Sequence, residues 1–297
     1  MRAAAGCLAL ALLFGAAAHA ATLSLDEFER ARRSQAIANG ERVSYVPLGA
    51  AHGVPVLLIH GYTDNARDWV PLVPYLDPQR RLLLVELRGH GHSSAPECCY
   101  TRYDFAYDLK LFLDALHIER ADLVGHSLGS IVAQALAEEW PQRTRRVVLI
   151  SSTGGPLPGA APEPRFDYAT PIRQLREPID PDSPFMLEWW GSPGAVDAEF
   201  LRRQRLDSAR IPLRVWLAVL DQGLGLAGLQ DGLARLKAPV LLIWGSKDPI
   251  MVESDRASLR RALPGAQVKI FEGRGHNPFW EDPPASAEVI NAFLAAP

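Results

Sequence analysis

The sequence predicts an α/β fold in which a mostly parallel central sheet is flanked by helices, with a helical cap inserted into it. Short runs rich in Val, Leu and Ile recur along the chain, as strands buried on both faces require. Helix-length segments with apolar residues at three-to-four spacing separate these runs. One long interval, residues 154–237, breaks the alternation because it contains no buried-strand run.

The composition is that of a folded, soluble-type chain. Hydrophobic residues make up 48% and charged residues 22% of the 297 residues, which excludes a disordered or collagen-like polymer. The net charge is −3, and the positive residues are interspersed with acids rather than gathered in a basic block. A nucleic-acid partner is therefore not expected.

Residues 1–20 have the pattern of a secretory signal peptide. A positive start at Arg2 precedes an apolar run, residues 7–18, and a small-x-small site ends at Ala20. The apolar run is shorter than the roughly 20 residues that a membrane span needs, and no later stretch approaches that length. The sequence thus predicts export to a periplasm or out of the cell, a mature chain from Ala21, and no membrane span.

Two cysteines of the mature chain, Cys98 and Cys99, are adjacent. In an oxidising compartment they either form a vicinal disulfide or stay as free thiols. Neither is expected to be catalytic, because a cysteine nucleophile needs a histidine base and an anion-binding site assembled around it.

The α/β core is predicted in two parts, residues 21–153 and 238–297. It opens with a helix at 25–33 and an edge strand at 42–48. Buried strands are predicted at 54–59, 82–87, 121–124, 147–150, 240–244 and 268–271. Helices are predicted at 68–76, 103–116, 128–140, 254–263 and 285–294. This alternation is that of repeated βαβ units.

The interval 154–237 is predicted to be a helical cap. It opens with a stretch rich in Pro and Gly and continues with amphipathic pieces at 200–206 and 215–224. A connection of this length is implausible as bare loop, so it should carry its own helices over one edge of the sheet. Trp189 and Trp190 are the candidate substrate-binding residues, since clefts between a cap and a core are often walled by aromatic rings. The alternative is that they form a plain cap core with Phe185 and Met186.

The sharpest chemical signal is Gly125-His126-Ser127-Leu128-Gly129, at the junction of a buried strand and a helix. It fits the G-x-S-x-G pattern, in which a tight strand-to-helix turn exposes a serine hydroxyl at the end of the sheet. The N-terminus of the following helix favours an oxyanion that forms there. Ser127 is therefore the candidate nucleophile, and the alternative is a serine that merely completes a tight turn.

A serine nucleophile needs a histidine base and an acid that orients it. Asp248 follows the strand at 240–244, and His276 follows the strand at 268–271. The chain order Ser127, Asp248, His276 is the one expected for this arrangement, and all three follow the carboxyl ends of strands, where open α/β sheets place their sites. For Asp248 the alternative role is a cap of the next helix.

An oxyanion hole needs backbone N–H groups from two segments. The N–H of Leu128 directly follows the nucleophile, and the N–H of Tyr62 lies in the loop after the strand at 54–59. These two amides are the predicted donors.

Together these motifs resemble the α/β-hydrolase fold family, in particular its carboxylesterase-like members with a serine nucleophile and an inserted helical cap. The resemblance extends over nearly the whole mature chain. Its residues are His60-Gly61 with Asp64 and Trp69, Arg88 to Ser93, Gly125 to Gly129, Gly245 to Asp248, and Gly275-His276 with Glu281-Asp282-Pro283. Two positions depart from the family pattern: Glu86, where Asp is frequent, and Ser130, where a second Gly is frequent. Relatives with an Asp nucleophile are excluded by Ser127.

Other histidines near these motifs are expected to be structural. His60 and His126 adjoin the site and are assigned to structural hydrogen bonding rather than proton transfer. His90 and His92 suggest a metal pair, but their Gly-rich turn and the lack of a nearby carboxylate or cysteine at ligand spacing favour a structural role. We therefore predict no metal and no cofactor.

The function predicted from the sequence is an exported serine hydrolase that cleaves carboxylic esters through an acyl-enzyme. Hydrolysis of an amide, a lactone, a thioester or a C–C bond by the same triad stays open, because the fold does not separate these reactions. Family resemblance also implies a cofactor-free haloperoxidase or perhydrolase as an alternative. A further alternative is a binding protein without catalysis, which the intact set Ser127, Asp248 and His276 argues against.

Overall fold

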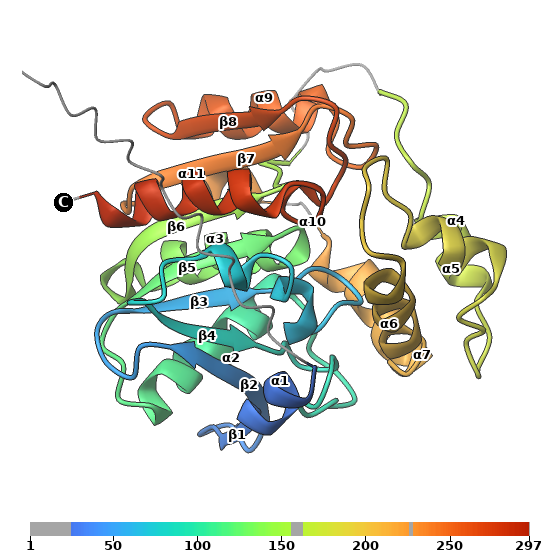
Figure 1. The fold of residues 1–297 in the computed structure, drawn as a ribbon, viewed down its shortest axis with the longest axis horizontal. Helices are drawn as coiled ribbons and strands as arrows, with labels where there is room; N and C mark the ends of the chain where they lie inside the picture. The colour runs from blue at the N-terminus through green and yellow to red at the C-terminus, as the bar shows by residue number, and fades with distance from the viewer. Residues whose placement is uncertain (1–24, 156–162, 226–227, 297) are drawn as a thin grey trace, which may run out of the picture.

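The computed structural model describes residues 25–155, 163–225 and 228–296, and the predicted signal peptide lies outside them. The strands form one eight-stranded sheet in the order β1-β2-β4-β3-β5-β6-β7-β8 (Figure 1). From β4 to β8 all neighbours are parallel, whereas β2 pairs antiparallel with β4 and β1 antiparallel with β2. The strands are β1 Arg33–Ala36, β2 Arg42–Gly49, β3 Pro55–Ile59, β4 Arg81–Val85, β5 Ala121–His126, β6 Thr144–Ile150, β7 Val240–Gly245 and β8 Gln267–Phe271. The predicted mostly parallel α/β sheet is confirmed.

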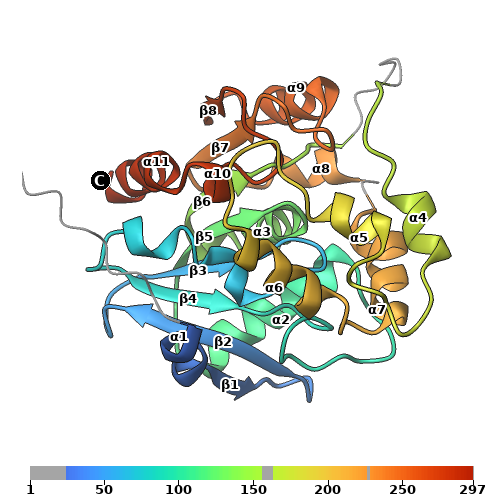
Figure 2. The same cartoon turned by 45° about the vertical axis from the view of Figure 1, so that its right-hand side comes forward.

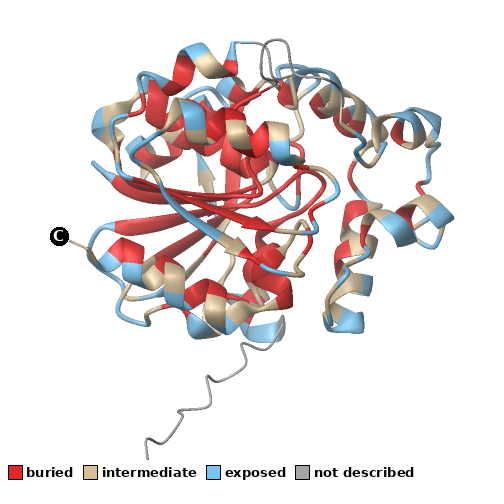
Figure 3. Cartoon of the chain, turned by 90° about the horizontal axis from the view of Figure 1, so that it is seen from above, coloured by how far each residue is buried: buried red, intermediate tan, exposed pale blue. Residues whose placement is uncertain are grey.

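The middle of the sheet is the core of the molecule. Figure 3 shows the middle of the sheet as buried. Every residue of β3, β5 and β7 is buried, and their sequences are mostly apolar, with Asp122 and His126 of β5 as the exceptions. Two strand predictions that concern the edges of the sheet are wrong. The strand at 42–48 is not an edge strand, because β1 pairs with its outer side. The strand at 268–271 is not buried on both faces, because β8 is itself the edge and Val268 is 45% exposed.

Helices cover both faces of the sheet (Figure 3). Those of the core are α1 Leu25–Ala31, α2 Arg102–Ala115, α3 Leu128–Glu139, α9 Glu253–Ala262, α10 Pro278–Glu281 and α11 Pro283–Ala295, with the short 3₁₀ turn η3 Pro141–Arg143 after α3. The α-helix predicted at 68–76 is wrong: the chain forms two 3₁₀ turns, η1 Ala66–Trp69 and η2 Val73–Tyr75. Pro71 and Pro74 lack an N–H and interrupt the α-helical hydrogen bonds there. No helix among the described residues is long and apolar enough to cross a membrane.

Between β6 and β7 the chain leaves the sheet and forms a further set of helices. They are α4 Ala169–Gln174, α5 Pro184–Trp189, α6 Ala198–Ser208, α7 Leu213–Ala218 with the π-helical turn η4 Val219–Gly223, and α8 Leu229–Leu233. Figures 1 and 2 show α4, α5, α6 and α7 grouped together at one side of the sheet. The last helix, α8, packs instead against α3 and α9 of the core. We call α4 to α7 the cap helices.

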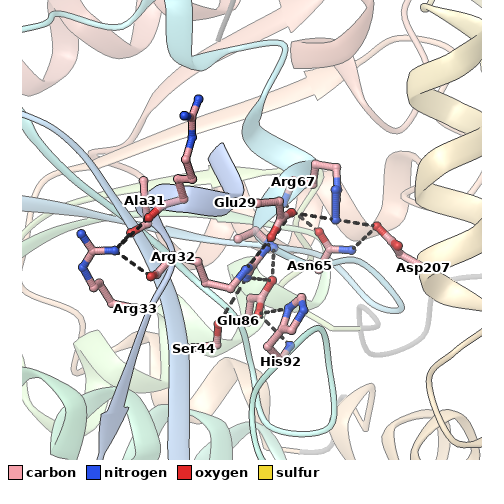
Figure 4. Close-up of polar contacts among 12 residues, drawn as sticks. Glu29, Ala31, Arg32, Arg33, Ser44, Asn65, Arg67, Glu86, His92 and Asp207 are labelled. Carbon is pink, nitrogen blue, oxygen red and sulfur yellow. Dashed lines mark hydrogen bonds and ion pairs between the residues drawn. The ribbon is translucent and has the colours of Figure 1, made fainter. Parts of the chain in front are cut away.

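Charged side chains attach the cap helices to the core. Arg67 in η1 lies 3.1 Å from the carboxylate of Glu29 in α1 and 3.0 Å from that of Asp207 in α6 (Figure 4). In the same network Arg32 lies 2.7 Å from Glu86, one of the two residues that depart from the family pattern. Elsewhere, Arg214 of α7 donates to the carbonyl of Pro96 at 2.7 Å. These contacts fix the cap helices over the loops that follow the strands.

A buried carboxyl on α3 makes the stability of this fold depend on pH. Glu138 is 2% exposed, and neither of its carboxyl oxygens has a hydrogen-bond partner among the described residues. Burial raises the pKa of Glu138 to about 7, and the nearby Arg102 and Arg235 offset burial only in part. The unfolded chain loses this proton near the ordinary pKa of 4.5. Between these two values the unfolded state binds fewer protons, so stability falls as the pH rises.

Glu138→Gln is therefore expected to stabilise the protein at pH 8, by at most about 3 kcal/mol, with no gain at pH 4. The amide fits the same space and carries no charge to desolvate. Urea denaturation at both pH values measures the difference. An equal effect at pH 4 and pH 8 would contradict the role of the buried charge.

Candidate active site

The turn between β5 and α3 holds Ser127 in a strained conformation. Its φ of +50° and ψ of −118° lie outside the regions that serine ordinarily adopts. The turn closes because a Cβ at Gly125 would overlap the carbonyl of Gly129, and one at Gly129 would overlap the carbonyl of Ile59. The Ser127 N–H donates to the carbonyl of Ile150 in β6 at 2.9 Å. Glycine at both positions is thus what allows the serine to sit at the tip of this turn.

Ser130, where the family pattern often has glycine, supports the turn from behind. Its hydroxyl lies 2.5 Å from the carbonyl oxygen of Ser127 and 2.7 Å from the hydroxyl of Ser152. Gln134 donates to the same Ser152 hydroxyl at 2.8 Å. Serine in place of glycine at position 130 therefore adds buried hydrogen bonds behind Ser127 and leaves the side of Ser127 that faces the cavity free.

Asp248 and His276 form a hydrogen-bonded pair. His276 Nδ1 lies 2.9 Å from Asp248 Oδ2, and Asp248 Oδ1 accepts from the amides of Ile250 at 2.9 Å and Met251 at 3.0 Å. Burial raises the pKa of the Asp248 carboxyl, but the His276 imidazole and these amides outweigh burial and hold that pKa below its ordinary value. Asp248 is therefore ionised at neutral pH and orients the imidazole.

A cavity of about 320 Å³ brings the predicted residues together. Ser127 and His276 both line it, whereas Asp248 stands behind His276. No hydrogen bond joins Ser127 to His276 among the described residues. The aromatic residues of the lining are Tyr62, Phe166, Trp189, Trp190 and Trp280. The cavity is thus built from the loops after β3, β5, β7 and β8 together with the cap side of the molecule.

Both tryptophans predicted to bind substrate lie in this lining. Trp189 donates from Nε1 to the hydroxyl of Thr63 at 2.9 Å, which ties α5 to the loop after β3. Trp190 stacks on Trp280 with ring centroids 6.0 Å apart. The sequence reasoning did not select Trp280, although its place four residues after His276 puts it beside the site. The two predicted tryptophans are therefore held by contacts with the core.

The predicted oxyanion donors, the backbone N–H groups of Tyr62 and Leu128, belong to two different segments of the chain. Leu128 is the first residue of α3, and Tyr62 follows β3. Neither backbone N–H donates to a protein acceptor within the part of the chain that the structure describes. The Tyr62 hydroxyl donates to the carbonyl of Trp216 in α7 at 2.6 Å. The phenol thus joins the core to the cap, while its backbone amide stays available.

A buried cluster beside Ser127 was not singled out from the sequence. Asp64, Asp68 and His126 are buried, and one ligand atom from each lies within 4.8 Å of the others, so these three are the described residues that could hold a metal ion. His126 Nδ1 is 3.6 Å from Asp68 Oδ2, and Trp280 Nε1 donates to Asp68 Oδ1 at 2.9 Å. Burial, reinforced by Asp68, raises the pKa of Asp64 well above its ordinary value, and burial lowers the pKa of His126. Burial therefore disfavours the charged forms of both Asp64 and His126 in this cluster.

The remaining histidines of the motifs lie apart from the nucleophile. His60 Nε2 accepts from the N–H of Leu87 at 3.0 Å, and burial lowers the pKa of His60 to about 4. His90 Nδ1 lies 2.9 Å from the carbonyl of Arg88, and burial lowers the pKa of His90 to about 3. His92 is exposed and lies 3.5 Å from a Glu86 oxygen. These contacts support the structural roles predicted for them.

Cys98 and Cys99 are joined by a disulfide in the loop before α2, so of the two states left open the structure shows the vicinal bond. The carbonyl of Cys99 accepts from Arg88 at 2.6 Å, and Arg88 also pairs with Asp108 of α2. This loop is outside the cavity lining.

Comparison with known proteins agrees with this architecture. The family model described as the alpha/beta hydrolase fold matches residues 54–228 and 210–283. A 2-hydroxy-6-oxononadienedioate/2-hydroxy-6-oxononatrienedioate hydrolase of Paraburkholderia phymatum is 31% identical over 264 residues, which cover 85% of this chain and 91% of that protein. A pimeloyl-[acyl-carrier protein] methyl ester esterase of Aeromonas hydrophila is 29% identical over 255 residues, covering 82% and 96% of the two chains.

Among solved structures, an esterase from Rhodococcus sp. has a TM-score of 0.77 and 23% identity to this chain. The match covers 90% of this chain and 99% of the esterase, and at this identity it shows the fold. The family model spans well over half of the sequence and includes the nucleophile turn. The chain therefore belongs to the α/β-hydrolase fold family.

Proposed function

We propose that the protein is an exported serine hydrolase that cleaves carboxylic esters through an acyl-enzyme, without a cofactor. The observation that carries this proposal is the position of Ser127, at a strained turn in the same cavity as His276, which Asp248 orients at 2.9 Å. This is the constellation that activates a serine hydroxyl.

The proposed reaction begins with proton transfer from the Ser127 hydroxyl to His276 Nε2. Asp248 accepts from Nδ1–H and so leaves Nε2 free to take this proton. The serine oxygen attacks the acyl carbon, and the N–H groups of Tyr62 and Leu128 hold the oxyanion, aided by the N-terminus of α3. The C–O bond to the alcohol breaks, and His276 returns its proton to the leaving oxygen.

Water completes the cycle. His276 takes a proton from water, and the resulting hydroxide attacks the acyl carbon of the acyl-enzyme. The bond to Ser127 breaks, the serine oxygen recovers the proton from His276, and the carboxylic acid leaves. The aromatic lining and a volume of about 320 Å³ favour a small or medium acyl group.

Hydrolysis of a C–C bond next to a ketone is the second candidate. The hydrolase of Paraburkholderia phymatum, whose named substrate is an oxo-dienedioate, favours it at 31% identity. The esterase of Aeromonas hydrophila, at 29% identity, favours ester cleavage to a similar degree. Ester cleavage is preferred because the lining is mostly apolar, as an uncharged acyl group requires.

Export belongs to the same proposal. Residues 1–20 have the charge, the apolar run and the cleavage site of a signal peptide. N-terminal sequencing of the protein recovered from outside the cytoplasm should begin at Ala21. An intact Met1 on that material would contradict cleavage at this site.

The reaction is tested with 4-nitrophenyl esters from acetate to dodecanoate and with a fluorophosphonate probe. Turnover with an optimum at short or medium chains, and labelling of Ser127 by the probe, are the expected results. Failure of the probe to label Ser127, with no ester turnover, would overturn the proposal in favour of a binding protein. Peroxide-dependent bromination that exceeds ester turnover would favour the haloperoxidase alternative.

A further inference from the structure

The loop after β3, residues 60–65, is bonded through its side chains to the cap helices, and we call it the Tyr62 loop. The Tyr62 hydroxyl donates to the carbonyl of Trp216 in α7 at 2.6 Å. The hydroxyl of the next residue, Thr63, accepts from Nε1 of Trp189 in α5 at 2.9 Å. The segment that carries one predicted oxyanion donor is thus bonded to two different cap helices.

The same two cap helices enclose the ring of Tyr62. Its centroid lies 6.0 Å from that of Trp189 and 5.6 Å from that of Trp216, and both contacts are edge-to-face. Although Tyr62 belongs to a loop, its exposed fraction is 5%. The ring and the hydroxyl of Tyr62 are therefore both held by α5 and α7.

Helix α6 contacts the two following residues of the Tyr62 loop. Gln204 Nε2 lies 3.4 Å from Asp64 Oδ1, and Asn65 Nδ2 lies 3.4 Å from Asp207 Oδ2 (Figure 4). These distances are long for hydrogen bonds, so the two contacts are weaker than those to α5 and α7. Four consecutive residues of the loop thus contact three cap helices.

The backbone of the Tyr62 loop is strained at Thr63. Its φ of +66° lies in the left-handed region, which a β-branched residue rarely adopts, and the residue is buried. Such a conformation persists where surrounding contacts hold it in place. The bond from Trp189 is a contact of this kind, and it comes from the cap.

We infer that the cap helices position the backbone N–H of Tyr62 for the oxyanion, with the hydroxyls of Tyr62 and Thr63 as the positioning groups. This inference rests on the proposed acyl-enzyme mechanism at Ser127. An oxyanion donor is effective at about 2.7–3.1 Å, and a displacement of about 1 Å lowers the rate about 10²-fold. Bonds that hold the Tyr62 loop against the cap therefore set a distance on which catalysis depends.

Thr63→Val tests the inference without altering the cavity lining, because Thr63 is outside that lining. Valine keeps the branched shape and removes the acceptor of the Trp189 N–H. With 4-nitrophenyl butyrate, kcat should fall about 10- to 100-fold while KM changes less than about threefold, because the oxyanion exists only in the transition state. Thr63→Ser keeps the hydroxyl and should retain kcat within about threefold. An unaltered kcat in Thr63→Val, or an equal loss in Thr63→Ser, would overturn the inference.

A tetrahedral analogue reports on the oxyanion site directly. The Ser127 oxygen adds to the carbonyl carbon of hexyl trifluoromethyl ketone, the hydroxyl proton goes to His276, and the ketone oxygen becomes an oxyanion. Hexyl methyl ketone stays a ketone and measures ground-state binding. In Thr63→Val and Tyr62→Phe, the inhibition constant of the trifluoromethyl ketone should rise at least about tenfold, and that of the methyl ketone less than about threefold. Equal changes for both ketones would show a merely structural role and overturn the inference.

Arg214→Met is the matched control for attachment of the cap. Arg214 of α7 donates to the carbonyls of Ala95 and Pro96, both at 2.7 Å, and these residues lie outside the Tyr62 loop. This variant loses two bonds between cap and core, yet the ratio of the two inhibition constants should change less than about threefold. If it changed as much as in Thr63→Val, loosening of the cap as a whole would explain both results and the inference would be wrong.

The inference and the proposed function fail in different ways. Unaltered trifluoromethyl ketone affinity in Thr63→Val and Tyr62→Phe, with ester turnover that still requires Ser127, would overturn the inference and leave the proposed function standing. Absence of both turnover and fluorophosphonate labelling in the unaltered protein would overturn the proposed function, and the inference with it.

Discussion

Ser127→Ala should lower kcat/KM for 4-nitrophenyl butyrate by about 10⁵- to 10⁶-fold, the largest effect expected of any single substitution in this protein. The hydroxyl oxygen of Ser127 forms the bond to the acyl group in the acyl-enzyme. Among the described residues, the one other serine that lines the cavity is Ser192, which follows α5. The residual rate would come from binding and from the backbone donors alone. Initial rates at substrate concentrations well below KM measure it.

The matched control for this variant is Ser34→Ala. Ser34 is an exposed residue of the edge strand β1, and its loss should change kcat/KM by less than about twofold. Circular dichroism and thermal unfolding should be unaltered in both variants, because Ser127 Oγ is outside the core hydrogen bonds. If Ser127→Ala hydrolysed the ester as fast as the unaltered protein, the serine mechanism would be wrong.

Asp248→Asn is expected to lower kcat by about 10³- to 10⁴-fold while the fold stays intact. The amide of asparagine donates to His276 Nδ1 and so stabilises the tautomer with the proton on Nε2. In that tautomer Nε2 no longer accepts the proton of Ser127. The lowered pKa of Asp248 keeps the unaltered carboxylate ionised from mildly acidic to alkaline pH, so the effect should persist across that range.

Stopped or continuous 4-nitrophenyl ester assays between pH 5 and pH 9 measure this loss. Asp26→Asn, in the exposed first turn of α1, provides a control with the same chemical change away from the site. A decrease below tenfold in Asp248→Asn would mean that another acid orients His276. Asp64 and Asp68 would then be the residues to replace next, because they lie buried beside His126.

The two results would separate the parts of the mechanism. Ser127→Ala removes the covalent step, whereas Asp248→Asn retains the nucleophile and alters only the base. A fluorophosphonate probe should therefore still label Asp248→Asn slowly and should fail to label Ser127→Ala. The reverse pattern would place the nucleophile elsewhere in the cavity.

The sequence by itself predicted the core strands and the order of the candidate site residues. Strands buried on both faces need mostly apolar runs, so β3, β5 and β7 were recognisable. The turn around Ser127 was recognisable for a local reason, since only glycine at positions 125 and 129 permits its close backbone approach. Because parallel strands end at the same edge of a sheet, chain order alone also placed Asp248 and His276 near it.

Other features depended on the tertiary structure. The position of β8 at the edge of the sheet depends on which strands find partners, and its apolar run does not encode this. Residues 68–76 have the apolar spacing of an α-helix, but Pro71 and Pro74 lack an N–H, and the chain forms 3₁₀ turns there instead. In each case a longer-range or backbone constraint decides between two structures that the local pattern allows equally.

The site shows the same division. Sequence motifs identify residues whose position is set by the local backbone. Ser127 is recognised by its tight turn, and Asp248 by the short loop in which it lies. Other parts of the site join residues that are far apart in the chain. These parts are the cavity wall, the contact of Trp189 with Thr63 and the cluster around Asp64. Their proximity and their altered pKa values arise from packing, because desolvation and side-chain contact exist only once the cap helices and the core loops have come together.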